Sequence, residues 1–132
     1  MSAQGKKYQL LMMEDDKFLL NMYSIKFEKL GFEVTPALTG AEALRKIQEG
    51  YIPNIMLCDL VMPGMSGLEF LETIRRDKLV PKAVVVVLSN QSDSPDIAKA
   101  MSLGAHGYIV KATKIPSEVV AEVLKIAKAQ GI

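Results

Sequence analysis

The feature that most constrains the fold is an alternation of short apolar runs with longer amphipathic segments. Between the runs and after the last one, apolar residues recur every three or four positions, which predicts helices. The runs themselves are rich in residues that suit strands buried on both faces. Such strands, joined by helices, predict a parallel sheet covered on both sides, a doubly wound α/β sandwich. The five predicted strands are Tyr8 to Met13, Phe32 to Thr35, Ile55 to Cys58, Ala83 to Leu88 and Gly107 to Val110.

Glycine and proline residues punctuate this alternation where helices and strands should end. Ser94 is predicted to be the N-cap of the helix after the fourth strand, and Pro95 its first residue. Pro116 fits the first turn of the last helix. Pro36 abuts the second strand, where a missing amide donor is tolerated mainly at a sheet edge, so that strand is predicted to be an edge strand. The other breakers are Gly31, Gly50, Pro53, Pro81 and Gly104.

Composition narrows the class of protein further. A chain of 132 residues, 49% apolar, can bury one core without a metal or a disulfide, and Cys58 has no cysteine to pair with. A formal charge of +1 does not suggest a nucleic-acid or membrane-surface partner. The longest aliphatic run is far shorter than the roughly 20 residues of a membrane span. We therefore expect one soluble cytoplasmic domain over residues 6–130, with residues 1–5 disordered.

Acidic residues follow two of the predicted strands. Glu14, Asp15 and Asp16 come directly after the first strand, and Asp59 ends the third. Open α/β sheets bind ligands at this carboxyl edge, and converging carboxylates favour a hard cation such as Mg²⁺. The alternative is that acids after a strand only cap a helix, which is the role expected for Asp16. Because Asp59 ends a strand at the same carboxyl edge of the sheet, a ligand site is the favoured interpretation for Glu14 and Asp15.

Two further polar residues end predicted strands at the same edge. Ser89 ends the fourth strand, and Lys111 follows the fifth. A hydroxyl and an ammonium there could hold phosphoryl oxygens and support an in-line displacement. Taken singly, such a serine is usually a turn former and such a lysine a surface residue. Because Ser89 and Lys111 are expected at the same edge of the sheet as the acidic residues, the four strand ends together favour a phosphoryl-transfer site.

Together these residues resemble the receiver domain of bacterial two-component response regulators, in particular the chemotaxis regulators. The motifs are EDD at 14–16, DLVMPGMSG at 59–67, Ser89, and GYIVK at 107–111, in order and at the proper intervals. The resemblance extends from about Lys6 to Ala129. It implies a flavodoxin-like three-layer sandwich of five parallel strands in the order 2-1-3-4-5, with the second strand at an edge.

The resemblance also implies a function. Asp59 would accept a phosphoryl group from a sensor histidine kinase, a phosphotransfer protein or a small acyl phosphate. Ser89 and Lys111 would bind the phosphoryl oxygens, and Tyr108 would be the switch aromatic that turns inward. Mg²⁺ would be held by Asp15, Asp59, the carbonyl of Val61 and, through water, Glu14.

The expected output is altered binding of a downstream effector protein, with no direct nucleic-acid contact and no membrane. The chain would be a signalling switch within a phosphorelay, and would catalyse only its own phosphorylation and dephosphorylation. The sequence leaves open homodimerisation, whether the domain stands alone, and the lifetime of the aspartyl phosphate.

Several residues depart from the family pattern or stand outside it. Ala112 occupies the place where most receivers have a proline after a cis peptide bond, which leaves the isomer of the Lys111–Ala112 bond undetermined. Asn90 replaces a smaller residue, so access to the phosphate could differ. Cys58 is expected in the core and His106 in a loop, and the methionines are expected to fill the core or loops.

Two other functions compete with the phosphorylated switch. A phosphatase of the haloacid dehalogenase type would want a second aspartate two residues after the nucleophile, and Val61 occupies that place. A degenerate receiver that docks partners without phosphorylation would tolerate loss of the acidic, hydroxyl or lysine groups, and this chain retains them all. The phosphorylated switch is therefore the favoured interpretation.

Overall fold

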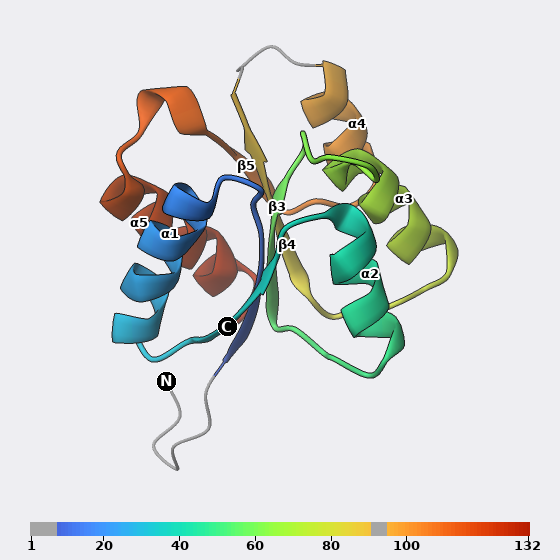
Figure 1. The fold of residues 1–132 in the computed structure, drawn as a ribbon, viewed down its shortest axis with the longest axis horizontal. Coiled ribbons are helices and arrows are strands. Elements are labelled where there is room, and N and C mark those ends of the chain that lie inside the picture. The colour runs from blue at the N-terminus through green and yellow to red at the C-terminus, as the bar shows by residue number, and fades with distance from the viewer. Residues whose placement is uncertain (1–7, 91–94) are drawn as a thin grey trace.

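A computed structural model of the protein describes residues 8–90 and 95–132 (Figure 1). The disorder expected at residues 1–5 and the N-cap expected at Ser94 lie outside the described residues. The helix predicted to begin at Pro95 does begin there.

The described residues form a sheet of five parallel strands in the order β2-β1-β3-β4-β5. The predicted alternation, the parallel pairing and the strand order are therefore confirmed. The strands are β1 (Gln9–Met13), β2 (Glu33–Ala37), β3 (Ile55–Asp59), β4 (Val84–Ser89) and β5 (Gly107–Val110).

Helices cover both faces of the sheet, with α1 and α5 on one face and α2, α3 and α4 on the other (Figure 1). Successive strand residues point to opposite faces, so Leu57 packs under α1 and α5 while Cys58 packs under the other three helices. Both faces are buried, which explains why the strands are apolar throughout. The helices are α1 (Lys17–Lys29), α2 (Gly40–Gln48), α3 (Gly67–Arg76), α4 (Pro95–Ser102) and α5 (Pro116–Ala129), with a short 3₁₀ helix at Lys111–Thr113.

Strand β2 lies at the edge of the sheet, as Pro36 predicted, but the strand is longer than expected. It was predicted to end at Thr35, and it continues through Pro36 to Ala37. The amide of Glu33 donates to the carbonyl of Tyr8, so the odd-numbered residues of β2 hydrogen-bond to β1. The nitrogen of Pro36 therefore faces the free edge, where no donor is needed.

The helix boundaries follow local signals. The carboxylate of Asp16 accepts the amides of Phe18 and Leu19, which makes Asp16 the N-cap of α1, as predicted. Pro116 is the first residue of α5, also as predicted. Leu30 is the C-cap of α1, one residue after the helix ends, and it is 45% exposed.

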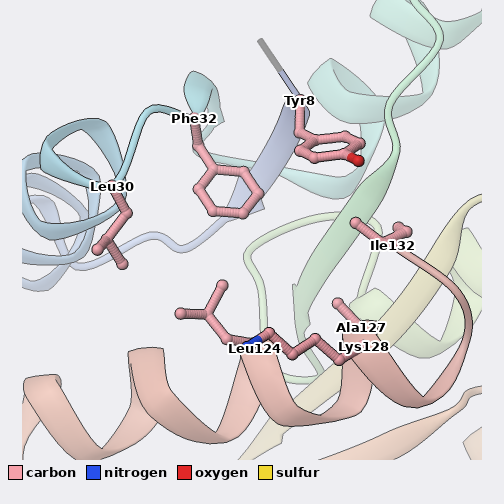
Figure 2. Close-up of a pocket in the computed structure, with 7 residues that line it drawn as sticks. All are labelled: Tyr8, Leu30, Phe32, Leu124, Ala127, Lys128 and Ile132. Atoms are coloured by element: carbon pink, nitrogen blue, oxygen red, sulfur yellow. The ribbon is translucent and has the colours of Figure 1, made fainter. Parts of the chain in front are cut away.

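A mostly apolar groove lies at the amino ends of β1 and β2, beside the end of α5 (Figure 2). It is far from the acidic residues, which follow the carboxyl ends of the strands. Its lining residues are Tyr8, Leu30, Phe32, Leu124, Ala127, Lys128 and Ile132. Within the described residues, no helix has the length and apolar character needed to cross a bilayer.

Candidate functional site

The predicted acidic residues meet at the carboxyl edge of the sheet. Glu14 follows β1 and is fully buried, and Asp59 is the last residue of β3 and is 4% exposed. Asp15 is exposed beside them, and one carboxylate oxygen from each of the three lies within 4.8 Å of the others. These residues line a pocket of about 340 Å³. The pairing of β1 with β3 brings the two strand ends side by side.

Lys111 reaches across the sheet into this pocket. Its ammonium donates hydrogen bonds of 2.8 Å to Asp59 Oδ2 and 2.8 Å to Glu14 Oε1. Burial works against the charge of Lys111, but the hydrogen bonds to the two carboxylates and their charges outweigh it, so its pKa is raised. Burial also raises the pKa of Glu14, and the nearby Asp59 charge adds to this. Lys111 therefore stays charged, as the counterion of two buried acids.

The charge balance of the pocket fits a divalent cation. Three carboxyl groups converge on one ammonium, so the acidic groups of the pocket outnumber the described cation that pairs with them. Oxygen ligands on a largely open pocket match the preference of Mg²⁺, which keeps several waters. Glu14, Asp15 and Asp59 are the described side chains that could hold such an ion.

The backbone after β3 fixes the second oxygen of the Asp59 carboxylate. The amide of Val61 donates to Asp59 Oδ1 over 3.1 Å, while Oδ2 binds Lys111. Val61 lines the pocket and is 70% exposed. Whether its carbonyl holds a metal, as the family resemblance implies, stays a prediction.

The remaining predicted site residues lie on β4 and β5. Ser89 ends β4 and is buried. Tyr108 pairs with Val87 across the sheet and so points to the face covered by α2, α3 and α4. Tyr108 is 47% exposed. The peptide bond between Lys111 and Ala112 is trans.

The pocket lining also includes residues beyond the predicted ligands, among them Asp16, which was predicted only as a helix cap, and Asn90, which was predicted to affect access to the phosphate. Leu19 forms an apolar part of its lining, and Asn90 lies at its rim after β4. Leu19 lies one turn after the Asp16 cap, and this spacing could have indicated that it faces the carboxyl edge. The bond between Lys111 and Glu14 was also missed, since nothing local in the sequence signals it.

Other residues take the places expected for them. Cys58 is fully buried, and burial raises the pKa of its thiol to about 12, so the thiol is unreactive in the folded state. His106 lies in the connection before β5, where its Nδ1 accepts the amide of Val85 over 3.0 Å. Met12, Met13, Met56 and Met62 are buried, and Met65 packs against the core.

The model of the response regulator receiver domain family matches residues 10–123. This chain belongs to that family. Receiver domains are signalling modules of two-component systems, which work with kinases and effectors and typically bind Mg²⁺ through acidic residues. The acidic residues that this receiver brings together are Glu14, Asp15 and Asp59.

Curated relatives extend the comparison. The receiver is 33% identical over 117 residues to the DNA-binding response regulator MtrA of Mycobacterium tuberculosis, covering 89% of this chain and 49% of the relative. It is 36% identical over 107 residues to the Regulator of RpoS of Escherichia coli, covering 80% of this chain and 31% of the relative. The chain thus spans half or less of the length of these relatives.

Solved structures share the fold. A CheY-like response regulator receiver domain protein from Methanospirillum hungatei is 26% identical, with a TM-score of 0.83 over 95% of this chain and 97% of that one. A putative response regulator from Chloroflexus aurantiacus is 28% identical, with a TM-score of 0.81 over 93% of this chain and 99% of that one. The likeness covers nearly the whole receiver, which makes the fold CheY-like and flavodoxin-like.

Proposed function

We propose that this receiver accepts a phosphoryl group on Asp59 and that the phosphorylated form binds an effector protein differently. The observation that carries the proposal is the convergence of Asp59 with Glu14, Asp15 and Lys111 at one edge of the sheet. Asp59 ends a fully buried strand, yet its carboxylate lines an open pocket. A donor could therefore approach this carboxylate from solvent.

In the proposed reaction, an oxygen of Asp59 attacks the phosphorus atom, and the bond from phosphorus to the donor breaks. The donor leaves as the neutral imidazole of a kinase or phosphotransfer histidine whose other ring nitrogen carries a proton, or as a free carboxylate when it is an acyl phosphate. Lys111 would move its hydrogen bond from Asp59 Oδ2 to a phosphoryl oxygen, and the Ser89 hydroxyl would donate to another. These contacts supply position and charge rather than a proton.

Mg²⁺ would be held by Asp15 and Asp59, by the carbonyl of Val61 and, through water, by Glu14. When bound, it would neutralise the carboxylates and the incoming phosphoryl oxygens. The fit of three carboxylate oxygens within 4.8 Å supports this ligand set. The excess of carboxyl groups over the single Lys111 ammonium supplies the electrostatic reason.

The proposed signal starts from the charge of the phosphoryl group. It adds about 1.5 to 2 negative charges at a place where Ser89 and Lys111 can respond. Movement of Ser89 would leave space for the exposed ring of Tyr108 to turn inward, which would alter the surface near β5. We expect this to take place in the cytoplasm, with a sensor kinase upstream and an effector downstream. Homodimerisation and the absence of nucleic-acid contact by this domain also stay proposals.

Incubation with acetyl phosphate and Mg²⁺, followed by intact-mass measurement, tests the proposal. The wild type should gain the mass of one phosphoryl group, and Asp59→Asn should gain none. Asp77→Asn, which changes an acid at the far end of α3, should label like the wild type. An adduct that persists in Asp59→Asn would reassign the acceptor. A wild type that stays unlabelled would favour the docking alternative.

A further inference from the structure

The connection between β3 and α3, residues 60–66, is held between two glycines that each begin a helix. A β-carbon added to Gly67, the first residue of α3, would overlap the carbonyl oxygen of Asp59 and lie 2.9 Å from its carbonyl carbon. A β-carbon added to Gly40, the first residue of α2, would overlap the carbonyl oxygen of Met65. Both obstacles are backbone atoms, which cannot swing aside as a side chain can.

Space, not backbone conformation, explains the glycine at position 67. Gly67 is not among the positive-φ glycines, so an alanine could adopt its φ without strain. Alanine is also the better helix former. The remaining explanation for the glycine is the close approach of the Asp59 carbonyl, which leaves no space for a side chain.

The backbone in contact with Gly67 belongs to the proposed site. The amide of Gly67 donates to the carbonyl of Leu60 over 3.2 Å, and the amide of Leu60 continues the ladder to Leu88 over 3.1 Å. The next amide, of Val61, holds the Asp59 carboxylate. One short segment, residues 59–61, thus carries the phosphoacceptor and the proposed carbonyl ligand, and α3 begins directly against it.

We propose that Gly67 is a positioning residue for phosphoryl transfer and metal binding at Asp59. Its missing side chain lets α3 begin against the peptide of Asp59, and this contact fixes the direction of the Asp59 carboxylate and of the Val61 carbonyl. Gly67 itself touches neither the phosphoryl group nor the metal. The inference rests on the proposed function of Asp59.

The test is Gly67→Ala, measured by titration with Mg²⁺ alone and by acetyl phosphate labelling. The added methyl group must displace residues 59–61 or the start of α3 by more than a few tenths of an ångström. A misplacement of about 1 Å can cost about 100-fold in rate, so we expect Mg²⁺ affinity and labelling rate to fall by about 10- to 100-fold. Amide NMR shifts of Val61 would report the Mg²⁺ titration.

Two further variants separate positioning from stability. Ile74→Val removes a buried methyl group from the same helix, two turns from the site, and should keep Mg²⁺ affinity and labelling rate within about twofold of wild type. In Gly40→Ala the added methyl group would overlap the carbonyl of Met65, which belongs to the same connection. This variant should lose Mg²⁺ affinity to an extent between those of Ile74→Val and Gly67→Ala. Circular dichroism would establish which variants are folded.

Each outcome bears on one of the two proposals. A folded Gly67→Ala with wild-type Mg²⁺ affinity and labelling rate overturns the positioning role. If Gly67→Ala does not fold, Gly40→Ala decides, and wild-type Mg²⁺ affinity in that variant overturns the role equally. A wild type that is never labelled refutes the proposed function instead, whatever the glycine variants show.

Discussion

Lys111 donates a 2.8 Å hydrogen bond to Asp59, and the same ammonium donates another of 2.8 Å to the fully buried Glu14. One cation therefore compensates two buried acids, and among the described residues it is their one ion-pair partner. In the proposed phosphorylation cycle, this ammonium hydrogen-bonds to the carboxylates before phosphorylation and to a phosphoryl oxygen afterwards. The ion pair is thus both a source of stability and a part of the proposed switch.

Replacing Lys111 by methionine should destabilise the fold in the absence of divalent cations. Methionine keeps an apolar stem but leaves Glu14 and Asp59 without their counterion, and a broken buried pair costs about 3 kcal/mol at the lower end of the usual range. Urea unfolding in the presence of a chelator would measure this. Lys125→Met, at an exposed position on α5, should stay within about 0.5 kcal/mol of wild type. Equal stability of the two variants would contradict the prediction.

Mg²⁺ should stabilise the folded protein. An ion that binds only the native state adds about 2.7 kcal/mol at a concentration of 100 times its dissociation constant. Thermal unfolding in MgCl₂ and in a chelator, at matched ionic strength, would show this as a higher Tm with Mg²⁺. Asp15→Asn should lose most of the increase and Asp77→Asn should retain it, because only Asp15 belongs to the acidic cluster. A full increase in Asp15→Asn would remove Asp15 from the ligand set.

His106 should make stability depend on pH in the mildly acidic range. Burial, and then the charge of Arg75, lower the pKa of His106, and its Nδ1 must be unprotonated to accept the Val85 amide. The folded pKa lies below the unfolded value of about 6.5. The contribution is therefore fully present above that value and is lost as pH falls through the folded pKa.

His106→Asn is the matched variant for this effect, because the asparagine carbonyl oxygen can accept the same amide without titrating. Urea unfolding of both proteins at pH 7.5 and pH 5 would measure the difference. Wild type should lose more stability than His106→Asn on acidification. Equal losses would show that His106 does not contribute.

Lys78→Gly should stabilise the protein by about 1 kcal/mol. Lys78 follows the C-cap of α3 with a φ of 54°, a left-handed conformation that costs a non-glycine residue about 1 to 2 kcal/mol. The equivalent residue after α2 is Gly50, with a φ of 109° and nothing within 4 Å of an added β-carbon. Gly50→Ala should therefore destabilise by a similar amount through backbone strain alone. Thermal unfolding of both variants checks the pair of predictions, and shifts in the same direction would refute them.

Much of the fold was predictable because its signals are local. Asp16 caps α1 through amides two and three residues away, and Pro116 begins α5 through its own ring geometry. The edge position of β2 followed from Pro36, but its length did not. Whether the strand could continue through Pro36 depended on which side of β2 meets β1, and that is a property of the assembled sheet.

The predicted site residues Glu14, Asp15, Asp59 and Lys111 were brought together by the structure, as the resemblance implied. The bond between Lys111 and Glu14 joins residues 97 apart, and no spacing rule reaches that far. Gly67 closes the motif at 59–67, but the physical reason for a glycine there was not predictable, since it arises from the approach of the Asp59 backbone.

The amino-acid sequence by itself determined the order of the strands and of the helices between them, the Asp16 cap of α1, the start of α5 and the family of the protein. These depend on side-chain periodicity and on hydrogen bonds within a few residues, which any short window of the chain contains. Only the tertiary structure decided that Lys111 is shared between Glu14 and Asp59 and that α3 begins against the acceptor's own peptide. Both features depend on distances between distant segments, and those distances exist only once the sheet has formed.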